Sequence, residues 1–415
     1  MNRLVLIGNG FDLAHGLKTS YKDFICWYWK QRVLSLCDFR EKTSDDGLCK
    51  FSILTHETWY YFFLYNHISI SLLEDKNFFE VTKNKEVFGI EYSPLFEAIH
   101  KSIETKGWVD IENDYYNLLK ECLNANAPEE IIVSLNSELQ LLQEKLVEYL
   151  KSIEVSDELL RTEIRQKIYA PFKTVDISIS GQYALEEHIE TGLGLSNRDW
   201  DWKLRSYNNI CYTKGYVDDY KKRRNDNDSY IEKDEPSHEL MLPNKIMLLN
   251  FNYTSTAHRY LKDSSIFSIN QIHGNLNNSS SVIFGYGDEI DEDYKMILNK
   301  NDNRYLSNNK SIRYLESDNY RKMLSFIESE PYQILIMGHS CGNSDRTLLN
   351  TLFEHKNCVS IKPYYYVNDE GKDNYIDIVQ NISRNFKDMK LMRDRVVNKT
   401  YCEPLTNNRV DGNGD

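Results

Sequence analysis

The sequence predicts an α/β protein, in which a parallel, Rossmann-like sheet is interrupted by a large and mainly helical insertion. Three observations support this prediction. The chain begins with a short apolar run, residues 1–7, which is followed at once by closely spaced glycines. Further apolar runs of strand length follow only after residue 240 or so. Between these two regions, residues from about 50 to 240 have the composition and periodicity of helices.

The apolar runs at 245–251, 266–272, 281–284 and 332–337 are predicted to be buried strands that join the first strand. The strand at 332–337 ends at Gly338. Residues 1–48 and 243–400 are therefore expected to form the sheet domain, and residues 49–242 the helical insertion or lid. Residues 401–415, above all those from Asn407, are expected to be a disordered tail.

Several helices are predicted within these domains. Residues 21–33 indicate an aromatic helix with Thr19 or Ser20 as its N-cap. Residues 51–73 are apolar nearly all round, as in a buried helix, and residues 132–153 carry a leucine stripe at helical spacing. We interpret that stripe as core packing. The charged segment 218–239 is predicted to be a loop.

Composition limits the classes of function. The net charge of −13 disfavours general binding to nucleic acid or anionic lipid, although the basic run at 221–224 leaves nucleic acid open. The eight cysteines form no C-x-x-C pair, so no metal site is predicted. No signal peptide and no apolar run of about 20 residues is present, so the expected location is the cytoplasm. The 29 tyrosines suggest surfaces that meet ligands or partners.

Polar clusters follow four of the predicted strands, at the point where each strand ends. The carboxyl ends of parallel strands meet at one edge of a sheet, so these clusters are expected to converge on a cleft for a dinucleotide. Glycine there would let a phosphate approach the backbone. The candidate binding residues are Gly8, Asn9, Gly10, Phe11, Asp12, His15, Gly16, Thr19, Thr254, Gly338, His339, Ser340 and Asp345; the candidate catalytic residues are Asn252 and His273.

Each candidate also has a structural interpretation, which the sequence leaves open. The glycines could simply form turns, and His15 or His273 could stabilise a turn by a hydrogen bond to the backbone. Asn252 could cap a helix that begins at Thr254. Asp12 could be a helix or turn cap that also reaches ribose hydroxyls. Residues 108–112 are interpreted as core with an N-cap, or as a lid contact.

The motif I-G-N-G-F-D-L-A-H-G-L-K-T-S-Y-K-D-F resembles the N-terminal signature of the AbiH family, which is associated with bacterial abortive infection against phage. W-V-D-I-E, F-N-Y-T, I-H-G-N and M-G-H-S-x-x-x-x-D resemble later blocks of that family. The order of these blocks is also similar to that in sirtuin-like NAD-binding domains. The resemblance spans residues 4 to about 350, although the helical middle has no such motif except the short block at 108–112.

This resemblance implies that Asn252 is a catalytic asparagine and His273 a catalytic histidine, and that NAD is the substrate or ligand, with no prosthetic group. It also implies that the first glycines form the dinucleotide loop and that the block from Gly338 contacts the nucleotide. The chain departs from the sirtuin-like pattern at Thr254, where aspartate is usual, and at Lys18, where proline is usual. The zinc-ribbon cysteines are also absent, which argues against protein deacetylation.

The residue types themselves suit cleavage of NAD. In NAD the nicotinamide ring carries a positive charge and leaves as a neutral molecule, so no general acid is needed to expel it. A neutral histidine can take a proton from water or a ribose hydroxyl, and an asparagine amide can orient either group without adding charge. The leading hypothesis is an antiphage NAD glycohydrolase, controlled through a homo-oligomer or a partner defence protein. The alternatives are a non-catalytic nucleotide sensor and a nucleic-acid-directed toxin.

A further alternative comes from the G-x-S-x-G pattern at 338–342, which is typical of the nucleophile elbow of α/β-hydrolases. That fold requires an acid and then a histidine downstream of the serine. The only later histidine is His355, fifteen residues after Ser340 and on a predicted helix. This spacing disfavours a hydrolase.

Overall fold

The computed structural model describes residues 1–38, 43–54, 82–106, 110–153, 160–207, 217–218, 220 and 236–406. The chain divides into two compact units, of which the first comprises Met1–Leu17, Val155–Val282 and Tyr314–Asp415. The second comprises Lys18–Glu154 and Ile283–Arg313. Each unit is therefore assembled from segments that are distant in the sequence.

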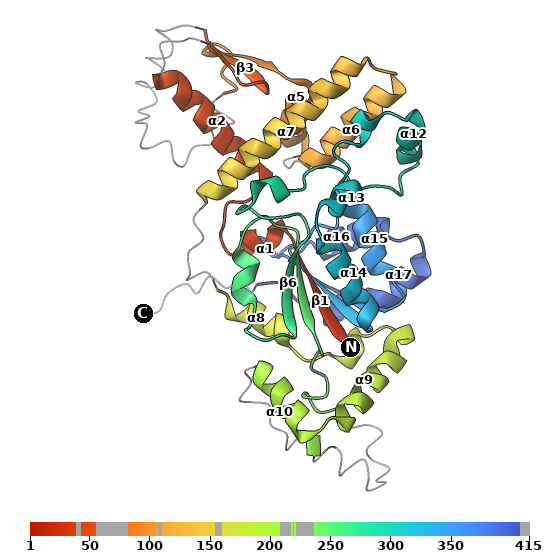
Figure 1. Ribbon diagram of the computed structural model, residues 1–415. Coiled ribbons are helices and arrows are strands. Elements are labelled where there is room, and N and C mark those ends of the chain that lie inside the picture. Colours follow the sequence, from red (N-terminus) through yellow and green to blue (C-terminus); the bar gives the residue numbers. More distant parts are fainter. Residues whose placement is uncertain are drawn as a thin grey trace, which may run out of the picture. The chain divides into compact units, whose positions relative to one another are not determined.

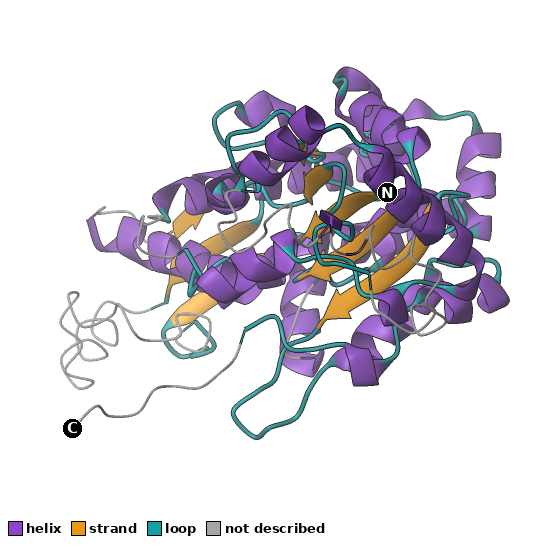
Figure 2. Cartoon of the chain, turned by 90° about the horizontal axis from the view of Figure 1, so that it is seen from below, coloured by secondary structure: helices purple, strands orange, loops and turns teal. Residues whose placement is uncertain are grey.

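The first unit contains a five-stranded parallel sheet (Figures 1 and 2). Its elements are β1 (Asn2–Ile7), α1 (Asn9–Ala14), α8 (Thr162–Tyr169), α9 (Gln182–Gly194), α10 (Asn197–Ser206), β5 (Ile246–Asn250), β6 (Phe267–Gln271), α14 (Asn319–Ser329), β7 (Tyr332–Met337), α15 (Arg346–Phe353), β8 (Cys358–Tyr364), α16 (Tyr375–Arg384) and α17 (Met389–Arg395). The strand order is β6-β5-β1-β7-β8. After β1, the chain first adds β5 and β6 on one side of this strand and later adds β7 and β8 on the other side. The order in which strands are added therefore reverses at β1.

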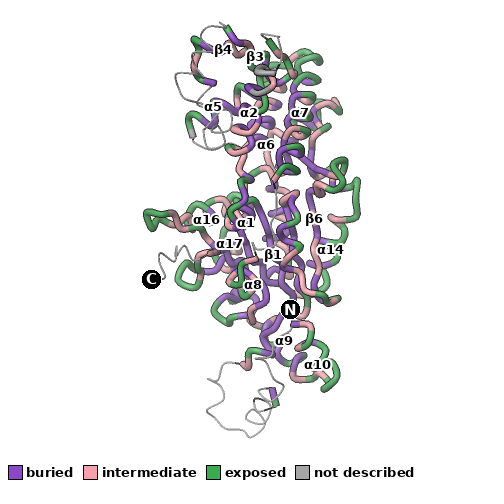
Figure 3. Tube along the Cα trace, turned by 90° about the vertical axis from the view of Figure 1, so that its left-hand side faces the viewer, coloured by how far each residue is buried: buried purple, intermediate pink, exposed green. Residues whose placement is uncertain are grey.

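Apolar strands and amphipathic helices explain why this sheet forms. Every residue of β1 is buried, and Figure 3 shows the buried colour along this strand. Val5 and Ile7 pack on one face of the sheet in a core cluster that includes Ile164 and Ile168 of α8. Burying each such side chain contributes about 1.5–3 kcal/mol. The helices α8 to α10 belong to the first unit, together with the parallel sheet, although they fall within residues 49–242, which were predicted to be the insertion.

The second unit is mainly helical and carries a three-stranded antiparallel sheet with the order β2-β3-β4. Its elements are α2 (Tyr21–Asp38), β2 (Thr43–Asp45), β3 (Cys49–Ile53), β4 (Phe88–Tyr92), α5 (Pro94–Lys106), α6 (Ile111–Asn124), α7 (Glu129–Ser152), α12 (Glu292–Lys300) and α13 (Lys310–Arg313). The leucine stripe of α7 is buried, as predicted. Ser20 is the N-cap of α2, because its hydroxyl accepts from the Asp23 N–H at 3.1 Å.

Some predicted elements are wrong. Residues 282–284 form no strand, because a 3₁₀ turn at Ser279–Ser281 precedes them and Gly285, at φ +155°, follows. Residues 51–53 lie in β3 rather than in a helix, and most of the remaining predicted helix, with most of the loop 218–239, lies outside the described residues. Leu405, expected in a disordered tail, is buried and donates its N–H to Tyr365 O at 2.8 Å. Residues 407–415 lie outside the described residues.

No helix of the described part of the chain is long and apolar enough to cross a membrane.

Candidate functional site

The carboxyl edge of the parallel sheet brings together loops from four strands. The loop after β1 contacts the loop after β7, because the Gly10 N–H donates to Gly338 O at 2.8 Å. The loop after β5 joins them through Asn252, whose Nδ2 donates to Gly8 O at 3.0 Å. Predicted clusters that are hundreds of residues apart in the sequence therefore meet at this edge.

His273, from the loop after β6, lies in a buried group that we call the His273 cluster: His273, Asp345, His339 and Tyr314. The Nε2 atom of His273 is 3.3 Å from Oδ1 of Asp345, and Nε2 of His339 is 3.7 Å from Oδ2 of the same carboxylate. The Tyr314 hydroxyl is 3.1 Å from Nε2 of His273. The side chains of the two histidines are 6% and 5% exposed and that of Asp345 is 11% exposed, so water screens these contacts weakly.

The local backbone orients the members of this cluster. The Cys341 N–H donates to Nδ1 of His339 at 3.0 Å, which leaves the proton of a neutral His339 ring on Nε2, the atom that faces Asp345. Cys341 itself has a left-handed backbone, with φ +55°. The ring of Phe251 packs edge-on against both imidazoles, with centroid distances of 5.2 Å to His273 and 4.2 Å to His339.

Asp345 occupies the N-cap position of α15, yet its side chain makes no capping hydrogen bond. Its carboxylate faces the imidazoles instead. A buried carboxylate in this position holds a histidine ring in one orientation and stabilises the imidazolium that forms when the ring takes a proton. The His273 cluster is therefore chemically suited to general base catalysis.

A second polar group lies at the same edge and centres on Asp12. Oδ2 of Asp12 accepts from the Thr254 hydroxyl at 2.6 Å, and the Thr256 hydroxyl donates to Thr254 Oγ1 at 3.4 Å. Burial raises the pKa of Asp12, and the hydrogen bonds from Thr254, Thr256 and Asn252 oppose this shift. Thr254, the departure from the sirtuin-like pattern, thus serves as a donor to an aspartate of another loop.

Among the described residues, the His15 ring forms hydrogen bonds to neutral groups. Its Nδ1 donates to Phe11 O at 2.6 Å, and its Nε2 accepts from the Tyr260 hydroxyl at 2.5 Å. The Arg161 N–H donates in turn to the Tyr260 oxygen at 2.9 Å. Burial lowers the pKa of His15, so the ring is neutral near pH 7. These contacts support the structural interpretation of His15.

The glycines of the first loop also have structural reasons to be glycine. A Cβ on Gly8 would lie 2.6 Å from the Cα of His339, and one on Gly10 would lie 2.9 Å from the Cα of Gly338. Gly16, at φ +78°, ends α1: its N–H donates to Leu13 O at 2.9 Å, and the next N–H donates to Asp12 O at 3.2 Å. The first two glycines let two loops pack closely, and the third terminates a helix.

The phosphate-binding role of this loop stays a prediction. The N–H groups of Gly8, Gly10 and Phe11 all donate to carbonyl groups of the protein. Asn9, like Ser340 of the β7 loop, is exposed. Thr19 belongs to the second unit, where its buried hydroxyl has no hydrogen-bond partner among the described residues.

Two alternative interpretations from the sequence are now decided. Ser255, not Asn252, is the N-cap of the 3₁₀ helix η6 (Thr256–Tyr260). Asp110 caps α6 as predicted, accepting from the Asn113 N–H at 3.1 Å.

The hydrolase alternative is also decided. His355 cannot act as the base for a nucleophilic Ser340, because His355 stacks on Tyr332 at the amino end of β7, whereas Ser340 follows the carboxyl end of that strand. The six residues of β7 separate them by about 20 Å.

Tyr314 and Tyr260 are site residues that the sequence did not indicate. Both lie on 3₁₀ helices, and neither directly follows the end of a strand, so the search of strand ends missed them. The high number of tyrosines was the only feature of the sequence that could have indicated them, and it was interpreted as a sign of surfaces that meet ligands or partners. Many tyrosines are in fact buried, including both of these, at 5% and 1% exposed.

No metal site emerges from the described residues, in which no group of three or more His, Cys, Asp or Glu side chains is placed to hold an ion.

Comparison with known proteins gives one match. The family model described as "Bacteriophage abortive infection AbiH" matches residues 4–366, which include both polar groups at the sheet edge. No curated protein and no solved structure matches the chain.

Proposed function

The chain belongs to the AbiH family of bacteriophage abortive infection, and from this premise we propose that it acts by cleaving the nicotinamide–ribose bond of NAD. The family itself supports an antiphage role. The NAD glycohydrolase activity is our inference from the sheet edge. The observation that carries it is the His273 cluster, a buried pair of imidazoles on one carboxylate beside the Asn252 loop.

The strand order supports a Rossmann-like assignment for the sheet. Numbered along the chain, the five strands run 3-2-1-4-5, which is the order of the first five strands in the dinucleotide-binding fold. In such sheets, ligands bind outside the carboxyl ends of the strands where the winding reverses. The loops of β1 and β7 meet at that point here.

The proposed reaction assigns a role to each residue. Nicotinamide departs as a neutral molecule and takes the electrons of the glycosidic bond, which leaves positive charge on the ribose. Water adds to that carbon and gives its proton to His273, while Asp345 holds the ring and stabilises its charge. The Asn252 amide orients the ribose or the water, after exchanging its hydrogen bond to Gly8 O. The products are ADP-ribose, nicotinamide and a proton.

The test measures nicotinamide release from NAD by the full chain and by the variants Asn252→Ala and His273→Ala. We expect each variant to lose about 10²- to 10⁴-fold in rate. His355→Ala is the matched control, because this histidine pairs with Glu328 at 3.1 Å at the amino end of the sheet. Absence of release by the wild type, even in phage-infected cell extract, would overturn the proposal, as would unchanged rates in both variants.

A nucleotide sensor without turnover is the second candidate. It is favoured by one observation: the Asn252 amide and the N–H groups of Gly8 and Gly10 are already bonded within the protein. Saturable binding of NAD or ADP-ribose with no hydrolysis would select it. The nucleic-acid-directed toxin has no support from the fold, since its basic run at 221–224 lies outside the described residues.

Control by assembly also stays a proposal. Constitutive consumption of NAD would kill the cell, so we expect a homo-oligomer or a partner defence protein to gate the activity. Light scattering that gives a strict monomer in both the resting and the NAD-consuming state would exclude the homo-oligomer.

A further inference from the structure

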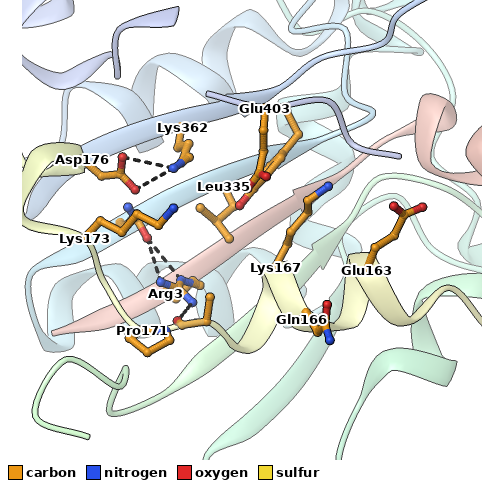
Figure 4. Close-up of a pocket in the computed structure, with 13 residues that line it drawn as sticks. Arg3, Glu163, Gln166, Lys167, Pro171, Lys173, Asp176, Leu335, Lys362 and Glu403 are labelled. Carbon is orange, nitrogen blue, oxygen red and sulfur yellow. Dashed lines mark hydrogen bonds and ion pairs between the residues drawn. The ribbon is translucent and has the colours of Figure 1, made fainter. Parts of the chain in front are cut away.

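A second polar site lies on one face of the parallel sheet, away from its carboxyl edge. A cavity of about 300 Å³ opens between the sheet and the segment from α8 to the 3₁₀ helix η3 (Thr174–Asp176) (Figure 4). Arg3, Leu335 and Lys362 line it from the strands β1, β7 and β8, and Lys167 lines it from α8. All of these residues belong to the first unit.

Arg3 carries a positive charge that no carboxylate in the described part of the chain neutralises. The residue is 2% exposed, and its guanidinium donates to neutral acceptors alone: Gln333 Oε1 at 3.0 and 3.3 Å, Ile168 O at 3.0 Å, and Ala170 O. It also lies over the ring of Phe172, 4.9 Å from the centroid. Asp176 attracts the guanidinium, but the hydrogen bonds of this carboxylate go to Lys362. A buried charge without a counter-ion is costly, because the hydrogen bonds replace water but do not cancel the charge.

The other cations of the cavity add to this excess. Lys167 donates to the carbonyl oxygens of Pro404 and Leu405 at 2.7 and 2.8 Å, so its partners are neutral as well. Lys173 is exposed, and its side-chain ammonium forms no hydrogen bond or ion pair with any described residue. Of the four cations, Lys362 is the one that forms an ion pair with a described residue, Asp176, at 2.8 Å.

The remaining acids do not balance these charges. Glu163 is half-buried and Glu403 is exposed, so water screens both of them more than it screens Arg3. The buried part of the cavity wall contains Arg3, Lys362 and Asp176, and therefore carries one uncompensated positive charge.

We propose that this cavity is a binding site for a small anion that carries a carboxylate or a phosphate group. The anion neutralises Arg3 across the cavity and is held by Lys167 and Lys173. The volume lies at the lower end of small-molecule sites, which suits a metabolite-sized anion and excludes a dinucleotide. The site is therefore distinct from the proposed NAD site and does not depend on it.

Calorimetric titration of the full chain tests this proposal, with inorganic phosphate in one arm and acetate in the other. Chloride keeps the ionic strength constant, so that general screening does not imitate binding. We expect saturable binding in at least one arm, and the arm that binds identifies the anion as a phosphate or a carboxylate. No saturable binding in either arm would overturn the proposal.

Two variants locate the binding. Lys173→Gln removes an exposed cation of the cavity and is expected to weaken binding about three- to fivefold. Lys387→Gln, an exposed lysine that does not line the cavity, is its matched control and should bind as the wild type does. Equal affinities of both variants and the wild type would place the anion elsewhere and overturn the proposal.

A cavity-filling variant makes the same test without changing charge. Ala170 lines the cavity, so Ala170→Leu is expected to abolish binding while Arg3 stays in place. A cooperative thermal melt confirms that this variant folds. If it does not fold, the Lys173→Gln comparison decides the result, because an exposed side chain is tolerated with little loss of stability.

Discussion

The loops that carry His15 and His273 belong to the same sheet edge, yet they give their imidazoles opposite surroundings. His15 bonds to a backbone carbonyl and a tyrosine hydroxyl, and burial lowers its pKa. His273 lies against the Asp345 carboxylate and the Tyr314 hydroxyl. Both rings are buried, at 2% and 5% exposed, so burial alone does not separate them.

The difference teaches that the partner, and not the position at a strand end, decides what a buried histidine can do. Neutral partners hold a ring in its uncharged form and make it a structural bridge. A carboxylate partner lets a ring take up a proton without leaving a buried charge uncompensated. The predictions below test this contrast.

The largest effect is expected when the carboxylate is removed from His273. Asp345→Asn keeps the shape of the side chain but cannot stabilise a charged ring, so NAD cleavage should fall by about 10²- to 10⁴-fold. Because Asp345 is a positioning residue, the pH profile of the remaining activity should also change. Glu328→Gln removes the exposed carboxylate beside His355 and should leave the rate unchanged. Equal rates of NAD cleavage in both variants would contradict the idea that the carboxylate partner decides the role of His273.

The next effect concerns stability. His15→Ala removes two buried hydrogen bonds and leaves Phe11 O and the Tyr260 hydroxyl without this partner. We expect a loss of about 2–4 kcal/mol in the free energy of unfolding, measured by urea denaturation. His355→Ala, at a partly exposed site, should cost less than about 0.5–1 kcal/mol. If His15→Ala lost no more stability than His355→Ala, the structural role of His15 would be refuted.

A smaller effect is expected at Gly16. Alanine in a left-handed conformation costs about 1–2 kcal/mol, and the space around Gly16 is otherwise open. Gly371, at φ +78° and also with open space, is the matched control in a turn of the loop after β8, outside the polar clusters predicted from the sequence. Equal losses of stability in Gly16→Ala and Gly371→Ala, with NAD binding unchanged, would show that Gly16 only terminates the helix α1. A loss of NAD binding in Gly16→Ala alone would restore the nucleotide-contact prediction.

The smallest effect is a pH dependence of stability. The pKa of His15 is lowered by burial, so the unfolded chain binds this proton more readily than the folded chain does. Stability should therefore fall as the pH drops below about 6.5, the value for an unfolded histidine, toward the folded pKa. In His15→Gln this part of the slope should vanish, as followed by thermal melts at several pH values. A slope identical to that of the wild type would show that other groups cause it.

Much of the fold followed from apolar runs, and the exceptions have physical reasons. The strands at 2–7, 246–250 and 332–337 were predicted because each is a fully buried, mostly apolar run. The strand at 267–271 was also predicted, although three of its five residues are only half-buried. β8 was missed, since Ser360, Lys362 and Pro363 interrupt its apolar pattern. Lys362 is tolerated there because Asp176 neutralises it.

The site was predictable as a meeting of loops but not as a set of contacts. Parallel strands place their carboxyl ends together, so Asn252 was correctly expected near the first glycine turn. The pairing of His273 with Asp345 depends on how the β6 and β7 loops fold back, which no periodicity encodes. The same holds for Tyr314, which reaches the cluster from a 3₁₀ helix 41 residues beyond His273.

The strand order has a consequence for synthesis of the chain. β1 occupies the centre of the sheet, yet its contacts bridge 244 residues to the β5 loop and 330 residues to β7. On the ribosome, this fully buried central strand therefore emerges long before either neighbour exists. Pairing between such distant segments slows folding and leaves an unpaired apolar strand that can aggregate. We therefore expect chaperones to bind nascent chains of this protein until β7 has been synthesised.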